Sequence, residues 1–240
     1  MPLKVGDTSI GALKVGGTGI AAAYVGDTQV FSSAPAAPVW HQDDTKTATS
    51  GFSTNNDITV DRPDNVSEGD LVVIVAYVGS GNISVPSGFS LVRDEQTIYD
   101  TRVGLFVKIA TDSEPSSYAV GSSDYTLISA VAGRVTGHHP TNYLGNDSGG
   151  DSGFQEVSSF DIPSLEAGPS ALLIAAWIYS RGNSISLDEP AMEAAASDEP
   201  GYSYSYIVGY ETVEEGSTGT RGASSGGTGR WAGAMFAIEA

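Results

Sequence analysis

Three tyrosines near the C-terminal end of the chain alternate with serines in a pattern that suits the recognition of sugars. Tyr202, Tyr204 and Tyr206 stand two positions apart, so a β-strand would place all three rings on one face. Flat rings stack on the C–H faces of sugars, and aromatic side chains line many ligand sites. The same row also fits a hydrophobic core, and an internal repeat described below favours the core for Tyr204 and Tyr206. Four tyrosines near expected strand ends or in loops are predicted as the exposed recognition surface: Tyr99, Tyr143, Tyr179 and Tyr202.

A serine nucleophile is the second chemistry that the residue types suggest. The string Gly150-Asp151-Ser152-Gly153 resembles the surroundings of the nucleophile in trypsin-like serine proteases, which also need a histidine base. The chain contains His41, His138 and His139, but no pattern places any of them beside Ser152. Ser-Gly-Phe occurs at residues 50–52 and again at 152–154, and the first copy lacks the preceding Gly-Asp. A structural role explains both copies, so we predict no catalytic residues and no enzyme.

Candidate sites for metal ions and phosphate are weak. Adjacent residues on an extended chain point to opposite sides, so His138 and His139 fit a loop better than one metal ion. Residues 146–151 lack the spaced ligands and closing glutamate of an EF-hand, which favours a solvated acidic turn. The glycine-rich residues 216–229 lack the ending of a phosphate loop and predict a long hairpin loop. No pair among the acidic residues is singled out for glycoside hydrolysis, so we expect no metal and no cofactor.

The chain is strongly acidic, and its excess negative charge lies outside the first 40 residues. Eleven basic and 29 acidic residues give a formal net charge of −18, while Lys4, Lys14, Asp7 and Asp27 cancel within residues 1–40. Such a surface repels phosphate backbones, so nucleic acid is not an expected partner. The chain has no cysteine, so disulfides and thiolate chemistry are excluded. It shows no leader pattern and no membrane-spanning run, and we expect synthesis in a cytoplasm without export or membrane insertion.

The first 31 residues carry a phrase that occurs three times at a spacing of ten residues. The copies are Lys4-Val-Gly-Asp-Thr8, Lys14-Val-Gly-Gly-Thr18 and Tyr24-Val-Gly-Asp-Thr28. Each copy predicts a strand, a two-residue turn and a strand, because glycine supplies the positive φ of such turns. A segment this small buries too little apolar surface to fold alone. The regular β-branched anchors argue against a disordered tail, and we predict an assembly interface formed by Val5, Ile10, Val15, Ile20, Val25, Val30 and Phe31.

A second and longer repeat follows a proline-bearing linker at residues 32–40, with an offset of 100 to 102 residues. The apolar run at 71–78 matches 171–178, and Val103 and Leu105 match Tyr204 and Tyr206. A continuous apolar run predicts a central strand buried on both faces. We predict an all-β chain in which the halves 41–142 and 143–240 each form one layer. Packed face to face, they would make an eight-stranded antiparallel β-sandwich, jelly-roll-like, with one shared core. Residues 190–197 are the only candidate for a short helix.

The repeats VGDT, VGGT and VGDTQVF resemble the short repeats, often of the form YLGST.V, that open fibre and minor tail proteins of tailed bacteriophages. The segments EGDLVVIVAYVGSGNISVPSGFSLV and GRWAGAMFAIEA are similar to a β-sandwich module common in phage fibres and adhesins, with Phe89 where tryptophan is usual. The resemblance implies a virion component, commonly a trimer, that is anchored by its N-terminus and displays its sandwich outward. It brings no catalytic residues.

Our first expectation is therefore a non-enzymatic fibre or spike in the virion, with sister chains and other virion proteins as partners of residues 1–31. The acidic sandwich would contact host-surface glycan, and multiple copies would add avidity. The second expectation is a capsid decoration or cement protein whose arm lies across capsid subunits. A glycan depolymerase is the third, although neither an acid/base pair nor a long β-helix supports it.

Overall fold

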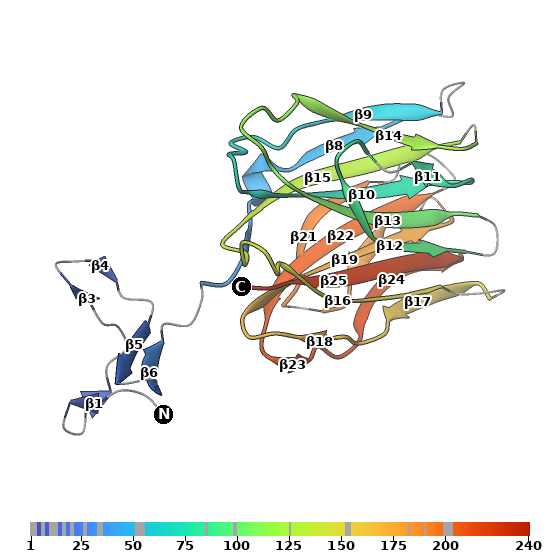
Figure 1. The fold of residues 1–240 in the computed structure, drawn as a ribbon. Helices are drawn as coiled ribbons and strands as arrows, with labels where there is room; N and C mark the ends of the chain where they lie inside the picture. Colours follow the sequence, from blue (N-terminus) through green and yellow to red (C-terminus); the bar gives the residue numbers. More distant parts are fainter. Residues whose placement is uncertain are drawn as a thin grey trace. The chain divides into compact units, whose positions relative to one another are not determined.

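The chain divides between Ala36 and Ala37 into two units, Met1–Ala36 and Ala37–Ala240 (Figure 1). In the first unit the structure describes the strand residues between 4 and 32, together with Ala36. In the second unit it describes residues 37–50, 56–84, 86–97, 100–124, 126–151, 155–181, 183–189, 191–198 and 204–240. The division falls inside the segment that the sequence predicts as a linker.

Three hairpins make up the described part of the first unit. The strands β1 (Lys4–Val5), β3 (Lys14–Val15) and β5 (Ala22–Val25) pair with β2 (Thr8–Ser9), β4 (Thr18–Gly19) and β6 (Thr28–Ser32), respectively. Val5 is paired with Thr8, and the two later copies repeat this register, so the predicted pairs of strands are present. Among the described residues, each of these strands pairs with one strand only.

The first half of the second unit contains a large and a small antiparallel sheet. The large sheet has the order β12 (Ser90–Gln96), β13 (Arg102–Ile109), β10 (Leu71–Val78) and β15 (Ile128–Thr136), with β7 (Val39–Trp40) and β8 (Lys46–Thr49) both on the outer edge of β15. A 3₁₀ turn, η1 (Gln42–Asp44), separates β7 from β8. The small sheet has the order β11 (Ile83–Ser84), β14 (Ser117–Ser122) and β9 (Asp57–Asp61).

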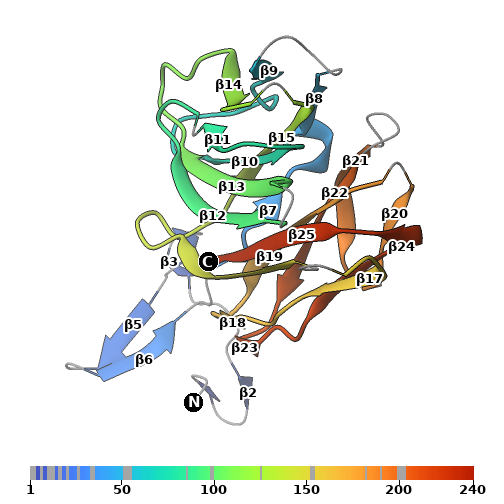
Figure 2. The same cartoon turned by 90° about the vertical axis from the view of Figure 1, so that its right-hand side faces the viewer.

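The second half repeats the order of the strands in the large and small sheets. Its large sheet has the order β21 (Glu193–Asp198), β22 (Ser205–Val213), β19 (Ala171–Tyr179), β25 (Trp231–Ile238) and β16 (Leu144–Asp151). Its small sheet has the order β20 (Ile185–Leu187), β24 (Arg221–Gly229) and β17 (Val157–Ile162), and β18 (Glu166–Ala167) pairs with β23 (Gly216–Ser217). The duplication is therefore present in the topology as well as in the sequence (Figure 2).

Alternating residues of the two central strands enter different hydrophobic cores. In β10, Leu71, Val73, Val75 and Tyr77 belong to a core that both halves share, while the residues between them pack with the small sheet of the first half. In β19, Leu172 and its alternate neighbours enter the same shared core, and Leu173 and its alternate neighbours pack with the second small sheet. The fold therefore has three cores, with both large sheets in the middle (Figure 2).

The all-β class is confirmed, but the prediction of one core between two single-layer halves is wrong. Each half has a large sheet, a small sheet and a core of its own, the second half also has the short β18–β23 pair, and the halves join through a third core. The physical reason is that the apolar runs in β10 and β19 are buried on both faces, as predicted, and each face needs its own cover. A single sandwich covers only one face of each sheet.

Three segments predicted as loop, turn or helix are strands. Residues 146–151 lie in β16, residues 221–229 form β24, and Glu193–Asp198 is β21 rather than a helical turn. Some of their glycines lie where another side chain approaches closely. At Gly149, for example, a Cβ atom would lie 2.4 Å from the Glu95 side chain of β12. Small residues in strands mark such close approaches as well as turns.

Polar contacts also tie the two halves together. The Tyr77 hydroxyl donates a 3.2 Å hydrogen bond to the Ile207 carbonyl, and the rings of Tyr77 and Tyr206 stack with centroids 4.5 Å apart. At another edge, Arg93 of β12 forms an ion pair with Asp147 of β16, with Nη1 and Oδ1 2.9 Å apart. The halves therefore share specific contacts in addition to apolar burial.

A buried carboxylate fixes the connection between β13 and β14. The Glu114 side chain accepts hydrogen bonds from Lys108 Nζ at 2.5 Å, the Thr111 backbone N–H at 2.9 Å and the Tyr118 hydroxyl at 3.2 Å. Burial opposes ionisation, but the contacts with Lys108 and Thr111 outweigh it and lower the pKa of Glu114 below its ordinary value. The carboxylate therefore stabilises this loop in its charged form.

Candidate functional site

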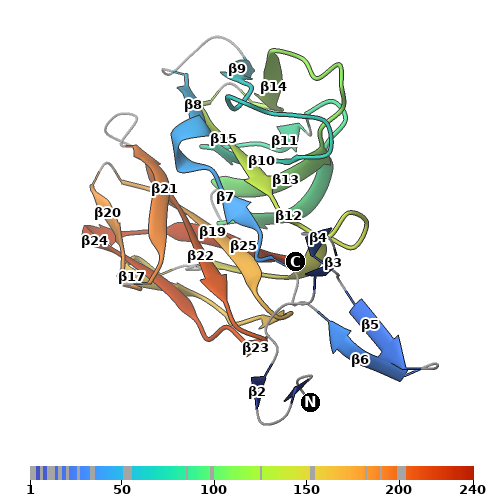
Figure 3. The same ribbon diagram turned by 90° about the vertical axis from the view of Figure 1, so that its left-hand side faces the viewer.

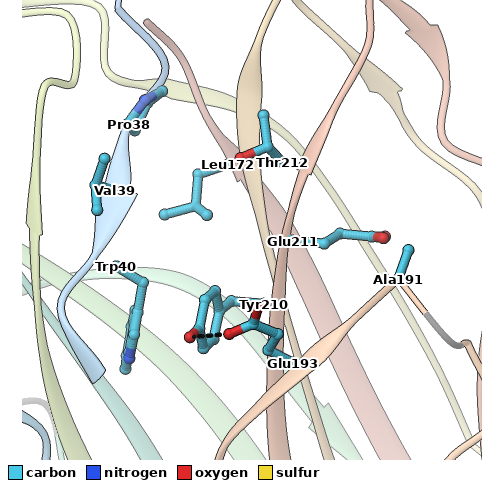
Figure 4. Close-up of a pocket in the computed structure, with 9 residues that line it drawn as sticks. All are labelled: Pro38, Val39, Trp40, Leu172, Ala191, Glu193, Tyr210, Glu211 and Thr212. Atoms are coloured by element: carbon cyan, nitrogen blue, oxygen red, sulfur yellow. Dashed lines mark hydrogen bonds between the residues drawn. The ribbon is translucent and has the colours of Figure 1, made fainter. Parts of the chain in front are cut away.

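The strand β7 of the first half lies beside the large sheet of the second half (Figure 3), and a groove lies between them (Figure 4). The first half contributes Pro38, Val39 and Trp40. The second half contributes Leu172, Ala191, Glu193, Tyr210, Glu211 and Thr212, and the enclosed space is about 180 Å³. Because one wall comes from each half, this site exists only when the two halves pack together.

Local geometry explains why Trp40 reaches this position. Trp40 pairs with Val135 in β15, and its side chain crosses over Gly133 of the same strand. A Cβ atom on Gly133 would lie 1.9 Å from Trp40 Cη2, so only glycine leaves room for the indole here. The Trp40 indole N–H donates to Thr45 Oγ1 at 3.1 Å, just past the η1 turn. The position of the indole ring is therefore set by the close approach to Gly133 and by the hydrogen bond to Thr45.

An aromatic pair joins the walls of the groove. The rings of Trp40 and Tyr210 stack with centroids 5.8 Å apart and an interplanar angle of 20°. Trp40 is 4% exposed, whereas Tyr210 is half-buried and lines the open part of the groove. The Tyr210 hydroxyl donates a 2.7 Å hydrogen bond to Glu193 Oε2. The Tyr210 ring is therefore fixed by stacking on one side and by this hydrogen bond at its tip (Figure 4).

The groove is acidic. Burial and, to a lesser degree, the neighbouring Glu193 carboxylate raise the pKa of Tyr210 to about 12, so its hydroxyl stays a donor at neutral pH. Glu211 is 8% exposed and is ion-paired with Arg221, while Glu193 is exposed. Arg221 does not line the groove, and neither does any other lysine or arginine that the structure describes. An anionic ligand would meet uncompensated repulsion in this site.

A second depression shares Trp40 with the groove and has a space of about 410 Å³. Its polar lining includes Gln42, Asn65 and Arg134. Burial opposes the ionisation of Asp44, but hydrogen bonds from Asn65 at 2.8 Å and from Arg134 at 2.8 Å lower its pKa. Arg134 also contacts Asp70 at 3.2 Å, so its charge is balanced within the protein. This depression offers hydrogen-bonding groups without a free cation.

The predicted recognition tyrosines do not come together in the part of the chain that the structure describes. Tyr179 is fully buried, stacks on Phe160 and donates a 2.7 Å hydrogen bond to the Gly227 carbonyl, so its prediction as an exposed ligand residue is wrong. The strand β19 extends through Tyr179 and takes the ring into the core. Tyr143 is half-buried beside His138, and Tyr99 and Tyr202 lie outside the described residues.

The core placement of the other two tyrosines is confirmed. Tyr206 is 2% exposed and belongs to the shared core, and Tyr204 packs against that core. Their faces match those of Val103 and Leu105 in the first half, as the internal repeat predicts. These two rings therefore hold the halves together and form no glycan platform.

The candidate catalytic and metal residues have structural roles where they are described. Ser152 lies outside the described residues. His138 contacts the carbonyls of Gly69 and His139, each at 3.0 Å, and His139 Nδ1 accepts the Asn142 N–H at 2.9 Å, as expected of loop residues. His41 contacts Thr136 Oγ1 at 2.8 Å. Within the described ranges, no group of three or more acidic or histidine side chains could hold a metal ion.

The residues predicted for assembly belong to the first unit. Most of them lie in its hairpin strands: Val5, Val15, Val25, Val30 and Phe31. Ile10 and Ile20 lie outside the described residues. The hairpins place the repeated valines at equivalent positions of successive two-stranded ribbons, and their contacts with partners stay a prediction.

Sequence reasoning missed the residues of the groove. Trp40 stands at the end of the linker, and Tyr210 ends a row of aromatic and valine residues that predicts a core strand. The one available signal was that a tryptophan follows a proline-rich linker, where no core strand was expected. Glu193 had no signal, because it lies in the segment predicted as a helical turn.

Comparison of the chain with protein-family models, with curated proteins and with solved structures finds no match. Among the described residues, no helix is long and apolar enough to cross a membrane.

Proposed function

We propose that the chain is a structural component of a tailed bacteriophage particle, of the fibre or spike type. Its first unit would anchor the protein to sister chains and to other virion proteins, and its second unit would be displayed outward. In this role the protein needs no catalytic group and no cofactor. Its task is to assemble and to present a stable surface to the host.

The observation that carries this proposal is the set of three separate hairpins in the first unit. Each hairpin pairs only within itself among the described residues, so each ribbon leaves edge groups without a strand partner. An isolated two-stranded hairpin is marginally stable in water. Three copies at a regular spacing therefore favour pairing with other chains, and a trimer matches the resemblance to phage fibres.

The distribution of charge supports the same orientation. The first 40 residues sum to zero, and the whole charge of −18 falls on the remainder. Like-charged second units repel one another, which keeps them apart and soluble. The neutral arm can approach its sister chains without this penalty.

The test is the oligomeric state of the full chain and of a chain lacking residues 1–31, measured by light scattering. We expect a trimer for the full chain and a monomer for the deletion, with circular dichroism checking that the β-structure is kept. Val25→Asp should weaken assembly, whereas Gln29→Asp in the same hairpin serves as the matched control for added charge. A monomeric full chain, or a deletion that stays trimeric, would overturn assembly through the arm.

Location in the particle is a separate test. Gold labelling at residue 240 on purified particles should mark the tail. Labelling distributed over the head would replace the fibre assignment with a capsid decoration protein.

A further inference from the structure

We infer that the groove between β7 and the large sheet of the second half binds a neutral oligosaccharide. The inference deepens the proposed function, because it rests on outward display of the second unit for its biological source of sugar. The site itself is defined by Trp40, Tyr210 and Glu193 and does not involve the arm.

The lining of the groove has apolar and aromatic surfaces that a sugar ring can contact. Val39 and Leu172 provide apolar contacts, and the half-buried face of Tyr210 adds an aromatic surface for sugar C–H groups. Val39 is 50% exposed, so an apolar side chain stays at the mouth of the groove instead of entering a core.

Hydrogen-bonding groups lie at the acidic end of the same groove. Glu193 Oε2 accepts the Tyr210 hydroxyl, and Glu193 Oε1 takes no hydrogen bond from any residue that the structure describes. An ionised carboxylate oxygen forms strong hydrogen bonds with hydroxyl donors. The exposed Thr212 adds a hydroxyl group that can both donate and accept. A sugar ring placed against Tyr210 could therefore form hydrogen bonds from its own hydroxyl groups to Glu193 and Thr212.

Charge selects a neutral ligand. The acidic lining and the overall charge of −18 disfavour sialic acids, uronic acids and phosphates. A small cation is the poorer match, because much of the lining is apolar and Glu211 is already paired with Arg221. One face of the Tyr210 ring is also covered by Trp40, which reduces the surface for a cation–π contact.

The size of the site favours a chain of sugars over a compact ligand. The groove encloses about 180 Å³, below the usual range of roughly 300–1,000 Å³ for pockets that hold drug-sized molecules. The second depression, which shares Trp40 with the groove, has further polar groups, including Gln42 and Asn65. One sugar ring in the groove and its neighbour in the depression would use both.

The experiment measures binding of the full chain to a panel of neutral oligosaccharides, followed by calorimetry with the strongest binder. Oligogalacturonate and spermine serve as the anionic and cationic probes. Tyr210→Ala removes the aromatic surface, and Thr212→Arg fills the groove from an exposed position without removing core packing. Leu91→Ala is the control, since Leu91 is an exposed apolar residue outside both depressions.

We expect binding of a neutral oligosaccharide only, weakened about tenfold or more by Tyr210→Ala and by Thr212→Arg. Leu91→Ala should change the affinity less than about twofold, within the scatter of near-neutral contacts. No binding of any neutral probe, preference for spermine or oligogalacturonate, or full binding by Thr212→Arg would overturn the inference. If the Tyr210→Ala variant does not fold, the affinity of Thr212→Arg for the sugar tests the inference by itself. Light scattering on the same samples distinguishes this inference from the proposed function. Loss of sugar binding by an intact trimer would refute only the sugar site in the groove.

Discussion

Gly133 offers the sharpest test of how Trp40 is packed. The proposed change is Gly133→Ala, which adds one methyl group to β15. That methyl would lie 1.9 Å from Trp40 Cη2 and 2.1 Å from Cζ2, whereas ordinary contacts begin at 3.4 Å. The indole would have to move by about 1.5 Å, the difference between these two distances.

The expected loss of stability follows from that displacement. Forcing an extra methyl group into a packed core costs about 1–3 kcal/mol. Moving Trp40 would also disturb its stacking on Tyr210, which contributes about 0.5–1.5 kcal/mol beyond burial in measured pairs. We therefore expect Gly133→Ala to lower the free energy of unfolding by about 3 kcal/mol.

Urea unfolding followed by circular dichroism measures this change as a shift of the midpoint at constant slope. Gly226→Ala in β24 is the matched control, because its Cβ would meet nothing within 4 Å, and it should stay within about 0.5 kcal/mol of the parent. In a Trp40→Leu background the penalty of Gly133→Ala should fall by at least about 1 kcal/mol, which a double-mutant cycle detects. Equal stability of Gly133→Ala and the parent, or no coupling to Trp40, would refute the reasoning.

Three further changes test other contacts. Glu114→Gln should lower the free energy of unfolding by about 2 kcal/mol at neutral pH, because it weakens charge-assisted hydrogen bonds to a buried carboxylate. Since the folded-state pKa of Glu114 is lowered, its stabilisation is present above the unfolded value of 4.5 and is lost as pH falls through the folded value, so acid unfolding profiles of the variant and the parent should converge. Tyr77→Phe removes the hydroxyl that donates to Ile207 and should cost about 1 kcal/mol in urea unfolding; an unchanged midpoint would show that this bond contributes nothing. Glu193→Gln should lower the pKa of Tyr210 from about 12 toward 10, seen as earlier tyrosinate absorbance in an alkaline titration that Tyr210→Phe eliminates, and an unaltered titration would contradict the contact.

The apolar run at 71–78 shows how far sequence reasoning reached. It correctly predicted a strand buried on both faces, and the matching run at 171–178 correctly indicated a duplicated element. The hairpins were predicted because two-residue turns have a local glycine signature. The strands β16 and β24 were missed, because runs of small residues also predict turns and loops. In β16, Gly149 instead leaves room for the side chain of Glu95, which is remote in the sequence.

The candidate site was less predictable than the fold. Tyr179 looked like a strand-end residue, but the strand continues through it and buries the ring. Trp40 and Tyr210 are far apart in the chain and belong to different halves, so no spacing links them. Their contact depends on how two large sheets cross, which local patterns do not encode.

The sequence by itself determined the all-β class, the three hairpins, the duplication and the separation of a neutral arm from an acidic remainder, because each depends on local propensity, periodicity or a count of charges. Only the tertiary structure decided that each half packs a large sheet on a small sheet around its own core, and that the halves meet through a third core. Alternation shows that Val72 and Val73 are both buried on opposite faces of β10, but it does not show which sheet covers each face. That choice depends on contacts between residues distant in the chain, and the groove beside Trp40 exists as a consequence of it.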